Sequence, residues 1–163
     1  MKAETGAETP AAKTAGAIFV SVPFGVEGDW RTGTEPARYS HAKADRFTAA
    51  LCREIAARGA ELRGSEFAFV SFSVGAAYLS LDQLYRTIQT LYDSLSVVPQ
   101  EQVIAVAAGT VDEAKAKVLR ESGFDRAELR LDGRRNPEAD FRVLREAGFG
   151  TVGCVLAYDA GGD

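Results

Sequence analysis

The sequence has few of the side chains that most often bind metals or carry protons. It contains a single histidine, His41, and only two cysteines, Cys52 and Cys154, which lie far apart in the chain. A metal centre or a Ser–His–Asp triad needs several such groups brought together. We interpret both cysteines as small buried hydrophobic residues, and His41 as a surface or helix-capping residue. We therefore expect no metal and no cofactor.

Long apolar runs and an excess of positive charge are also missing. No stretch approaches the roughly 20 apolar residues of a membrane helix, and the N-terminus has no apolar core of the kind found in secretory signals. The 19 basic and 23 acidic residues give a formal net charge of -4, which leaves no surplus of positive charge for phosphates. We expect a cytoplasmic protein with no nucleic-acid and no membrane partner.

Residues 1–16 are rich in Ala, Thr, Glu and Lys and offer too little apolar surface to offset the entropy of ordering, so they are predicted to form a disordered tail. Residues 17–163 are predicted to form a single α/β domain in which short β-rich runs alternate with stretches of helical period. The predicted strands are residues 17–22, 67–73, 102–108, 126–131 and 151–158. The predicted helices are about residues 40–62, 81–94, 111–121 and 137–147, the last of them starting at Asn136-Pro137.

This strict alternation predicts parallel strands joined by right-handed crossovers, which gives a (βα)4β sheet. Such a sheet is typical both of a doubly wound open fold and of a partial barrel. Periodicity does not choose between the two.

The loop after the first predicted strand carries a family resemblance. The segment reads IFVSVPFGVEGDWRTG and resembles the opening of the radical S-adenosylmethionine (SAM) proteins related to oxygen-independent coproporphyrinogen oxidase and the haem chaperones. In that family the strand runs into Pro-Phe-Cys-x3-Cys-x2-Cys. Pro23 and Phe24 are present here, but the three cysteine positions fall on Gly25, Asp29 and Thr32.

Later segments, including residues 130–133 and 155–162, extend the resemblance over about residues 17–163. FSVGAAYLSLDQL is similar to the family's glycine run and Leu-Ser-x-x-Gln-Leu, but the glycines become Phe72-Ser73-Val74-Gly75. AVAAGTVDEAKAKVLRESGFDR is similar to the family's Glu-Ala-Asn-Pro-Gly-Thr-Val segment, with Ala105 at its acidic position. The resemblance implies a truncated, partial TIM-like barrel.

The altered positions imply that the family's chemistry is lost. A [4Fe–4S] cluster is held by cysteine thiolates, which glycine cannot replace and aspartate or threonine replace poorly. The glycine run lets the backbone approach SAM, and Phe72 and Val74 would obstruct that approach. We expect no iron–sulfur cluster and no radical SAM activity.

Strand alternation predicts a polar trough on one face of the sheet. Glu128, Arg130 and Asp132 share a face, and Ser71 and Ser73 are expected to point the same way. One interpretation is a solvated face, because five strands cannot close a barrel. The other is a small-molecule site at the carboxyl ends of the strands. Its further candidate residues are, on the rim, Arg134, Arg135, Tyr158 and Asp159 and, in a lid loop over residues 25–36, Glu27, Asp29, Trp30 and Arg31.

Three functions remain open on the sequence alone. The first is a non-catalytic pseudoenzyme that acts as a partner or scaffold subunit, through self-association or by docking to a radical SAM or biosynthetic enzyme. The second is a protein that binds a metabolite or a tetrapyrrole. The third is a cluster-free acid/base enzyme that uses Asp132 or Glu128.

Overall fold

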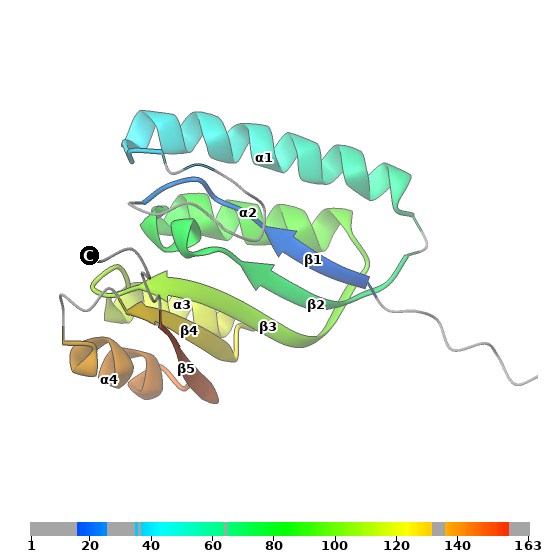
Figure 1. Cartoon of the computed structure of the whole chain (residues 1–163). Helices are drawn as coiled ribbons and strands as arrows, with labels where there is room; N and C mark the ends of the chain where they lie inside the picture. Colours follow the sequence, from blue (N-terminus) through cyan, green and yellow to red (C-terminus); the bar gives the residue numbers. More distant parts are fainter. Residues whose placement is uncertain (1–15, 26–34, 36, 64, 132–135, 157–163) are drawn as a thin grey trace, which may run out of the picture.

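The chain folds into five parallel strands that alternate with four α-helices (Figure 1). The computed structural model describes residues 16–25, 35, 37–63, 65–131 and 136–156. Its strands are β1 (Gly16–Val20), β2 (Phe67–Phe72), β3 (Val97–Ala107), β4 (Arg126–Leu131) and β5 (Thr151–Leu156). Its helices are α1 (His41–Glu61), α2 (Leu81–Ser94), α3 (Glu113–Glu121) and α4 (Glu138–Glu146), with a short 3-10 helix, η1 (Val74–Tyr78), after β2.

The strand order resolves the choice between an open sheet and a partial barrel. The strands lie side by side in the order β1-β2-β3-β4-β5, and every pairing is parallel. Right-handed crossovers between successive neighbours place every helix on the same face, whereas a doubly wound sheet needs the order to reverse. The helices accordingly contact one another in sequence along the outer side of the sheet (Figure 1). The fold is a partial TIM-like barrel.

The register divides the strand residues between a convex face under the helices and a concave face. Phe72, Ile104 and Ala127 align across β2, β3 and β4, and all three are fully buried beneath the helices. The neighbouring row, Phe19, Ser71, Val103 and Arg126, points to the concave face. Because Phe19 keeps 56% of its surface exposed, the concave side is open to solvent at β1.

Local sequence signals act at the start of three helices. Ser80 and Gln83 form a capping box at the start of α2, in which each side chain accepts a hydrogen bond from the other's backbone N–H. The helix α3 begins at Glu113, two residues after the predicted start, because the side chain of Asp112 caps it by accepting from the Lys115 amide. The helix α4 begins at Glu138, one residue after the predicted start, with Pro137 as its N-cap, and the Asn136 side chain accepts a hydrogen bond from the Glu138 amide.

Several boundaries and one element differ from expectation. β1 begins at Gly16, one residue inside the predicted tail. β3 begins at Val97 and includes Pro99. Proline lacks an amide donor, and a register shift of β3 against Phe67 and Phe69 of β2 accommodates it. The described part of β5 ends at Leu156. The helix η1 has no hydrophobic period and was not predicted. No helix in the described ranges is long and apolar enough to cross a membrane.

Candidate functional site

The loop after β1 is closed at its base by backbone bonds. The amide of Gly25 donates to the Ala37 carbonyl at 3.3 Å, and the Ala37 amide donates to the Pro23 carbonyl at 2.6 Å. Phe24 is buried between them and the first helix, with its ring edge-on to Tyr39 at 5.7 Å and to Phe47 at 5.5 Å. The Pro-Phe pair thus serves as an anchor in the core.

Gly25, the first degenerate cluster position, lies against the ring of Tyr78 from η1. Its φ is +132°, a conformation that favours glycine, and a Cβ placed there would come within 3.1 Å of Tyr78 Cε2. A cysteine at this position would therefore be strained in its backbone and crowded by the aromatic ring. Together with Asp29 and Thr32 in the sequence, this geometry does not fit a thiolate-held cluster.

Side chains at the carboxyl ends of the strands join each βα unit to the next. Ser73, after β2, accepts a hydrogen bond from the Val22 amide at 2.8 Å and donates to the Val22 carbonyl at 3.3 Å. Lys115 of α3 donates to the Ala77 carbonyl of η1 at 2.6 Å. Asp140 of α4 accepts from the Gly109 amide at 2.8 Å. Three polar contacts therefore hold this end of the sheet as one frame.

Burial changes the pKa of the lysine in this frame. It lowers the pKa of Lys115 from its usual value, and the nearby Asp112 carboxylate opposes part of that effect. The ammonium also reaches the Thr110 carbonyl at 3.4 Å. These partners make Lys115 a structural link between α3 and η1.

The predicted trough residues that the structure describes do lie on the concave face. Ser71 is 2% exposed on β2, and Glu128 and Arg130 alternate along β4 on the same side. Ser73 lies past the end of β2, at the rim, and its hydroxyl is engaged with the backbone of Val22. The remaining predicted site residues lie outside the described ranges: Glu27, Asp29, Trp30, Arg31, Thr32, Asp132, Arg134, Arg135, Tyr158 and Asp159.

An ion-pair network lies at the amino end of this face, around a residue that was not among the predicted site residues. Arg126 of β4 contacts Glu101 of β3 at 3.1 Å and Glu128 at 3.2 Å. Its Nε is buried and makes no hydrogen bond within the described ranges. Alternation along β4 places Arg126 on the same face as Glu128, so the sequence did contain the signal for it. The sequence did not indicate that β3 is longer than predicted and therefore includes Glu101.

Two sequence interpretations need correction. Phe72 does not obstruct the concave face: its side chain is fully buried on the convex side, edge-on to Phe124 at 5.3 Å. Cys154 is not a buried residue, because the convex face of β5 leaves it exposed, whereas Cys52 is partly buried between α1 and α2.

The structure places His41 at the first position of α1, exposed, with its Nε2 3.4 Å from Asp45. This is the surface position expected for it. Among the described residues, no three His, Cys, Asp or Glu side chains are grouped so that they could hold a metal ion.

Comparisons with known proteins agree with this architecture. No family model matches the sequence, and no curated protein matches it. Among solved structures, the fold is similar to coproporphyrinogen III oxidase (HemN) from Escherichia coli, which is described as a radical SAM enzyme. The two chains are 21% identical with a TM-score of 0.75, over 90% of this chain and 38% of the enzyme. The likeness confirms the predicted radical SAM-type fold, and this chain spans well under half of the enzyme's length.

Proposed function

We propose that the chain is a non-catalytic protein on a radical SAM-type partial barrel, and that it works by docking another protein surface onto its concave face. The observation that carries the first half of this proposal is the contact between Gly25 and Tyr78. The position at which the resembled family has its first thiolate is filled by packing rather than left as an open ligand position.

The two cysteines in the sequence support the same conclusion. Cys52 is on α1, and Cys154 is on β5 at the far edge of the sheet from β1. Neither belongs to the loop after β1, and a cubane cluster needs several thiolates converging on one point. Chemistry that depends on reductive cleavage of SAM is therefore not part of the proposal.

The open concave face supports the second half of the proposal, that another protein docks there. Sheets made only of parallel strands usually have both faces covered. Here Phe19 of β1 is 56% exposed, and its ring lies 5.6 Å from that of Phe69 on β2. An exposed aromatic ring beside a second, partly buried one, on a type of sheet that is usually covered, marks a surface that is stabilised when a partner excludes water from it.

The polar half of the trough favours a protein partner over a small ligand. Arg126 is already shared between Glu101 and Glu128, and the Ser73 hydroxyl is committed to the backbone of Val22. A small polar ligand would have to displace these contacts, whereas a protein surface can cover the apolar half at β1 and β2. The partner is a second copy of this chain or an enzyme of the radical SAM or a biosynthetic class.

Photo-crosslinking distinguishes the concave face from the outer surface. A photoreactive phenylalanine analogue is placed at position 19 or, as a matched control, at position 85, because Tyr85 on α2 is 57% exposed. We expect protein adducts from position 19 and none from position 85. An adduct of twice the chain mass in purified protein identifies a second copy, and an adduct formed only in the native extract identifies another protein.

Equal labelling from both positions, or none from either, would reject the docking function. A thermal-shift screen with SAM, haem and central metabolites tests the alternative of a small-molecule site. Stabilisation by one of them that depends on Arg130 would favour that alternative.

A further inference from the structure

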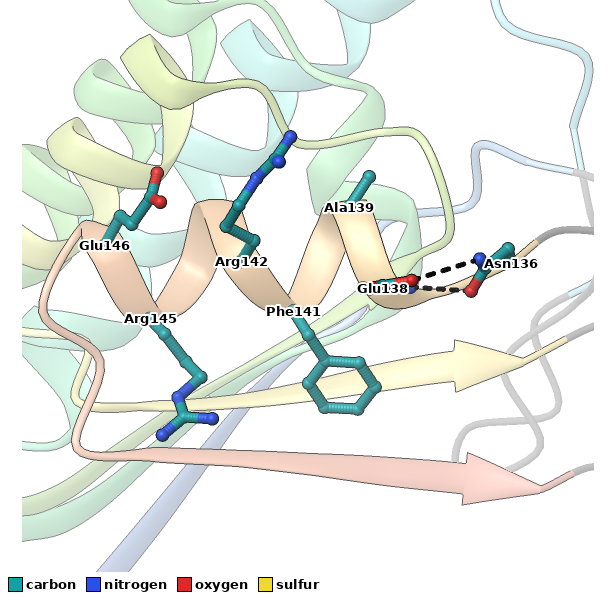
Figure 2. Close-up of a pocket in the computed structure, with 7 residues that line it drawn as sticks. All are labelled: Asn136, Glu138, Ala139, Phe141, Arg142, Arg145 and Glu146. Carbon is teal, nitrogen blue, oxygen red and sulfur yellow. Dashed lines mark hydrogen bonds between the residues drawn. The ribbon is translucent and has the colours of Figure 1, made fainter.

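The two hollows beside α4 do not hold a nucleophilic side chain in a fixed environment. The hollow of about 690 Å³ along α4 has no lysine, cysteine, serine or histidine among its described lining residues; Arg145 projects toward the strands and Arg142 from the other side of the helix (Figure 2). A hollow of about 480 Å³ between α3 and α4 contains Lys117, which is 75% exposed and lies 3.9 Å from Glu121. A lysine with fixed surroundings lies instead at the carboxyl end of the sheet.

The amine of Lys115 is held between two backbone carbonyls. It donates to the Ala77 carbonyl of η1 at 2.6 Å and to the Thr110 carbonyl, just before α3, at 3.4 Å. Within the described ranges no third acceptor and no carboxylate contacts its Nζ. An ammonium group carries three N–H donors, whereas a neutral amine carries two and a lone pair. The two carbonyls therefore match the neutral amine and leave its lone pair unengaged.

Burial acts in the same direction as this hydrogen-bond geometry. The Lys115 side chain is half-buried, and burial lowers its pKa, while the Asp112 carboxylate opposes part of that effect. A larger share of this side chain is therefore a free amine at neutral pH than for an ordinary lysine. Only the free amine attacks a carbonyl carbon, so Lys115 has the properties of a nucleophile.

We propose that Lys115 is an acylation site for small acyl phosphates. The amine nitrogen bonds to the carbonyl carbon, the bond from that carbon to the phosphate oxygen breaks, and the phosphate leaves with the proton that the nitrogen releases. The product amide keeps one N–H, which can still donate to the Ala77 carbonyl. A neutral imine formed with an aldehyde would keep none and would leave both carbonyls without a donor, so the surroundings favour acylation over Schiff-base formation. The donor must be small because the amine is half-buried.

Acylation of Lys115 changes how η1 is attached to α3. It removes the positive charge and one of the two hydrogen bonds that the amine donates. The same short helix carries Tyr78, whose ring lies against Gly25 in the loop after β1. The modification therefore weakens the attachment of the element that packs on this loop. This inference concerns the carboxyl end of the sheet and does not depend on the docking function proposed for the concave face.

Acetyl phosphate tests the site in the full chain at neutral pH, with the acetylated fraction of each lysine measured by peptide mass spectrometry. We expect Lys115 to be acetylated about fivefold faster than the exposed Lys117 on the same helix and Lys43 on α1. Asp112→Asn keeps an oxygen that can cap α3 but removes the opposing charge. This variant should raise the rate at Lys115 about twofold and leave the rate at Lys43 unchanged.

Denaturant unfolding measures the consequence for the fold. Acetylated wild type should unfold at a lower denaturant concentration than untreated protein. Lys115→Arg keeps the positive charge and has no amine to acylate at this position, so the same treatment should leave its midpoint unchanged. The inference is overturned if Lys115 reacts no faster than Lys117, if Asp112→Asn does not change its rate, or if treatment lowers the midpoint of Lys115→Arg by as much as that of the wild type.

Discussion

The ring of Tyr78 lies against the backbone of Gly25, so that a β-carbon at position 25 would come within 3.1 Å of its Cε2. This contact ties η1 to the loop after β1 at the carboxyl end of the sheet. Position 25 favours glycine for two reasons: its φ is positive, and the ring of Tyr78 leaves little room for a β-carbon. The predictions that follow concern this end of the sheet and the packing beneath it.

Gly25→Ala should lower the free energy of unfolding by about 1–3 kcal/mol, because an alanine there adopts a rarely populated φ and crowds Tyr78. Chemical denaturation measures the effect. In a Tyr78→Ala background the cost of Gly25→Ala should shrink but not vanish, since the backbone strain remains. A cost that is the same in both backgrounds would mean that the ring does not crowd this position.

Gly75→Ala should be more severe, because its Cβ would overlap the carbonyl oxygen of Val22 and also approach that of Phe24 at 2.8 Å. Backbone atoms on both sides leave no flexible side chain to move aside, so we expect a loss of roughly 3 kcal/mol or more. Gly153→Ala on β5 is the control, since its Cβ meets nothing nearer than 4.0 Å. If both variants lose equal stability, the close approach of η1 to the first loop is not the cause.

Ser73→Ala removes the two hydrogen bonds with the Val22 backbone and leaves buried groups without their partner. We expect a loss of about 1–3 kcal/mol, measured by denaturant unfolding. Ser65→Ala, at an exposed turn residue, should stay within about 0.5 kcal/mol of the wild type. An unchanged midpoint for Ser73→Ala would show that this contact does not hold β1 to β2.

Lys115 should make stability rise with pH in the alkaline range. Its pKa is lowered by burial in the folded chain, so between that value and its ordinary pKa of 10.5 the unfolded chain holds the proton more firmly. Raising the pH through this window removes the proton from Lys115, and with it a positive charge that burial disfavours in the folded chain but not in the unfolded chain. Unfolding curves of Lys115→Met should lack the rise, and an identical pH profile in both proteins would contradict the assignment.

Tyr92 should have the opposite effect above pH 10. Burial raises its pKa, and the hydrogen bond of its hydroxyl to Gln102 at 2.6 Å lowers it by less. Above 10.0 the unfolded chain ionises first, so stability falls as pH rises toward the folded pKa. Tyr92→Phe should remove this fall and should cost about 1 kcal/mol at neutral pH for the lost hydrogen bond. A fall of the same size in the variant would place its origin elsewhere.

Elements set by local chemistry were predictable from the sequence. The start of α2 follows from Ser80 and Gln83, which form their own capping box without help from the rest of the fold. The strand order was not, because parallel strands in either topology carry the same apolar runs. The helix η1 was missed because it depends on the approach of Gly75 to Val22, a contact between segments far apart in the sequence.

In the candidate site, too, the features set by local sequence were predictable and those that depend on distant contacts were not. Alternation correctly placed Ser71, Glu128 and Arg130 on one face, since a strand fixes the direction of every second side chain. It did not reveal that Phe72 turns away from that face into the core, although its position next to Ser71 carried that information. The role of Tyr78 required the fold, because nothing in the sequence of η1 indicates that its ring reaches Gly25.

The central proposal is that this chain, with Gly25, Asp29 and Thr32 at the family's cysteine positions, does not hold an iron–sulfur cluster. Anaerobic reconstitution of the full chain with iron, sulfide and reductant tests it directly, with iron and acid-labile sulfide measured per chain after desalting. We predict a colourless protein with neither element retained above the level of a Cys52→Ser/Cys154→Ser control. Stoichiometric iron and sulfide in the wild type, lost in that control, would contradict the account.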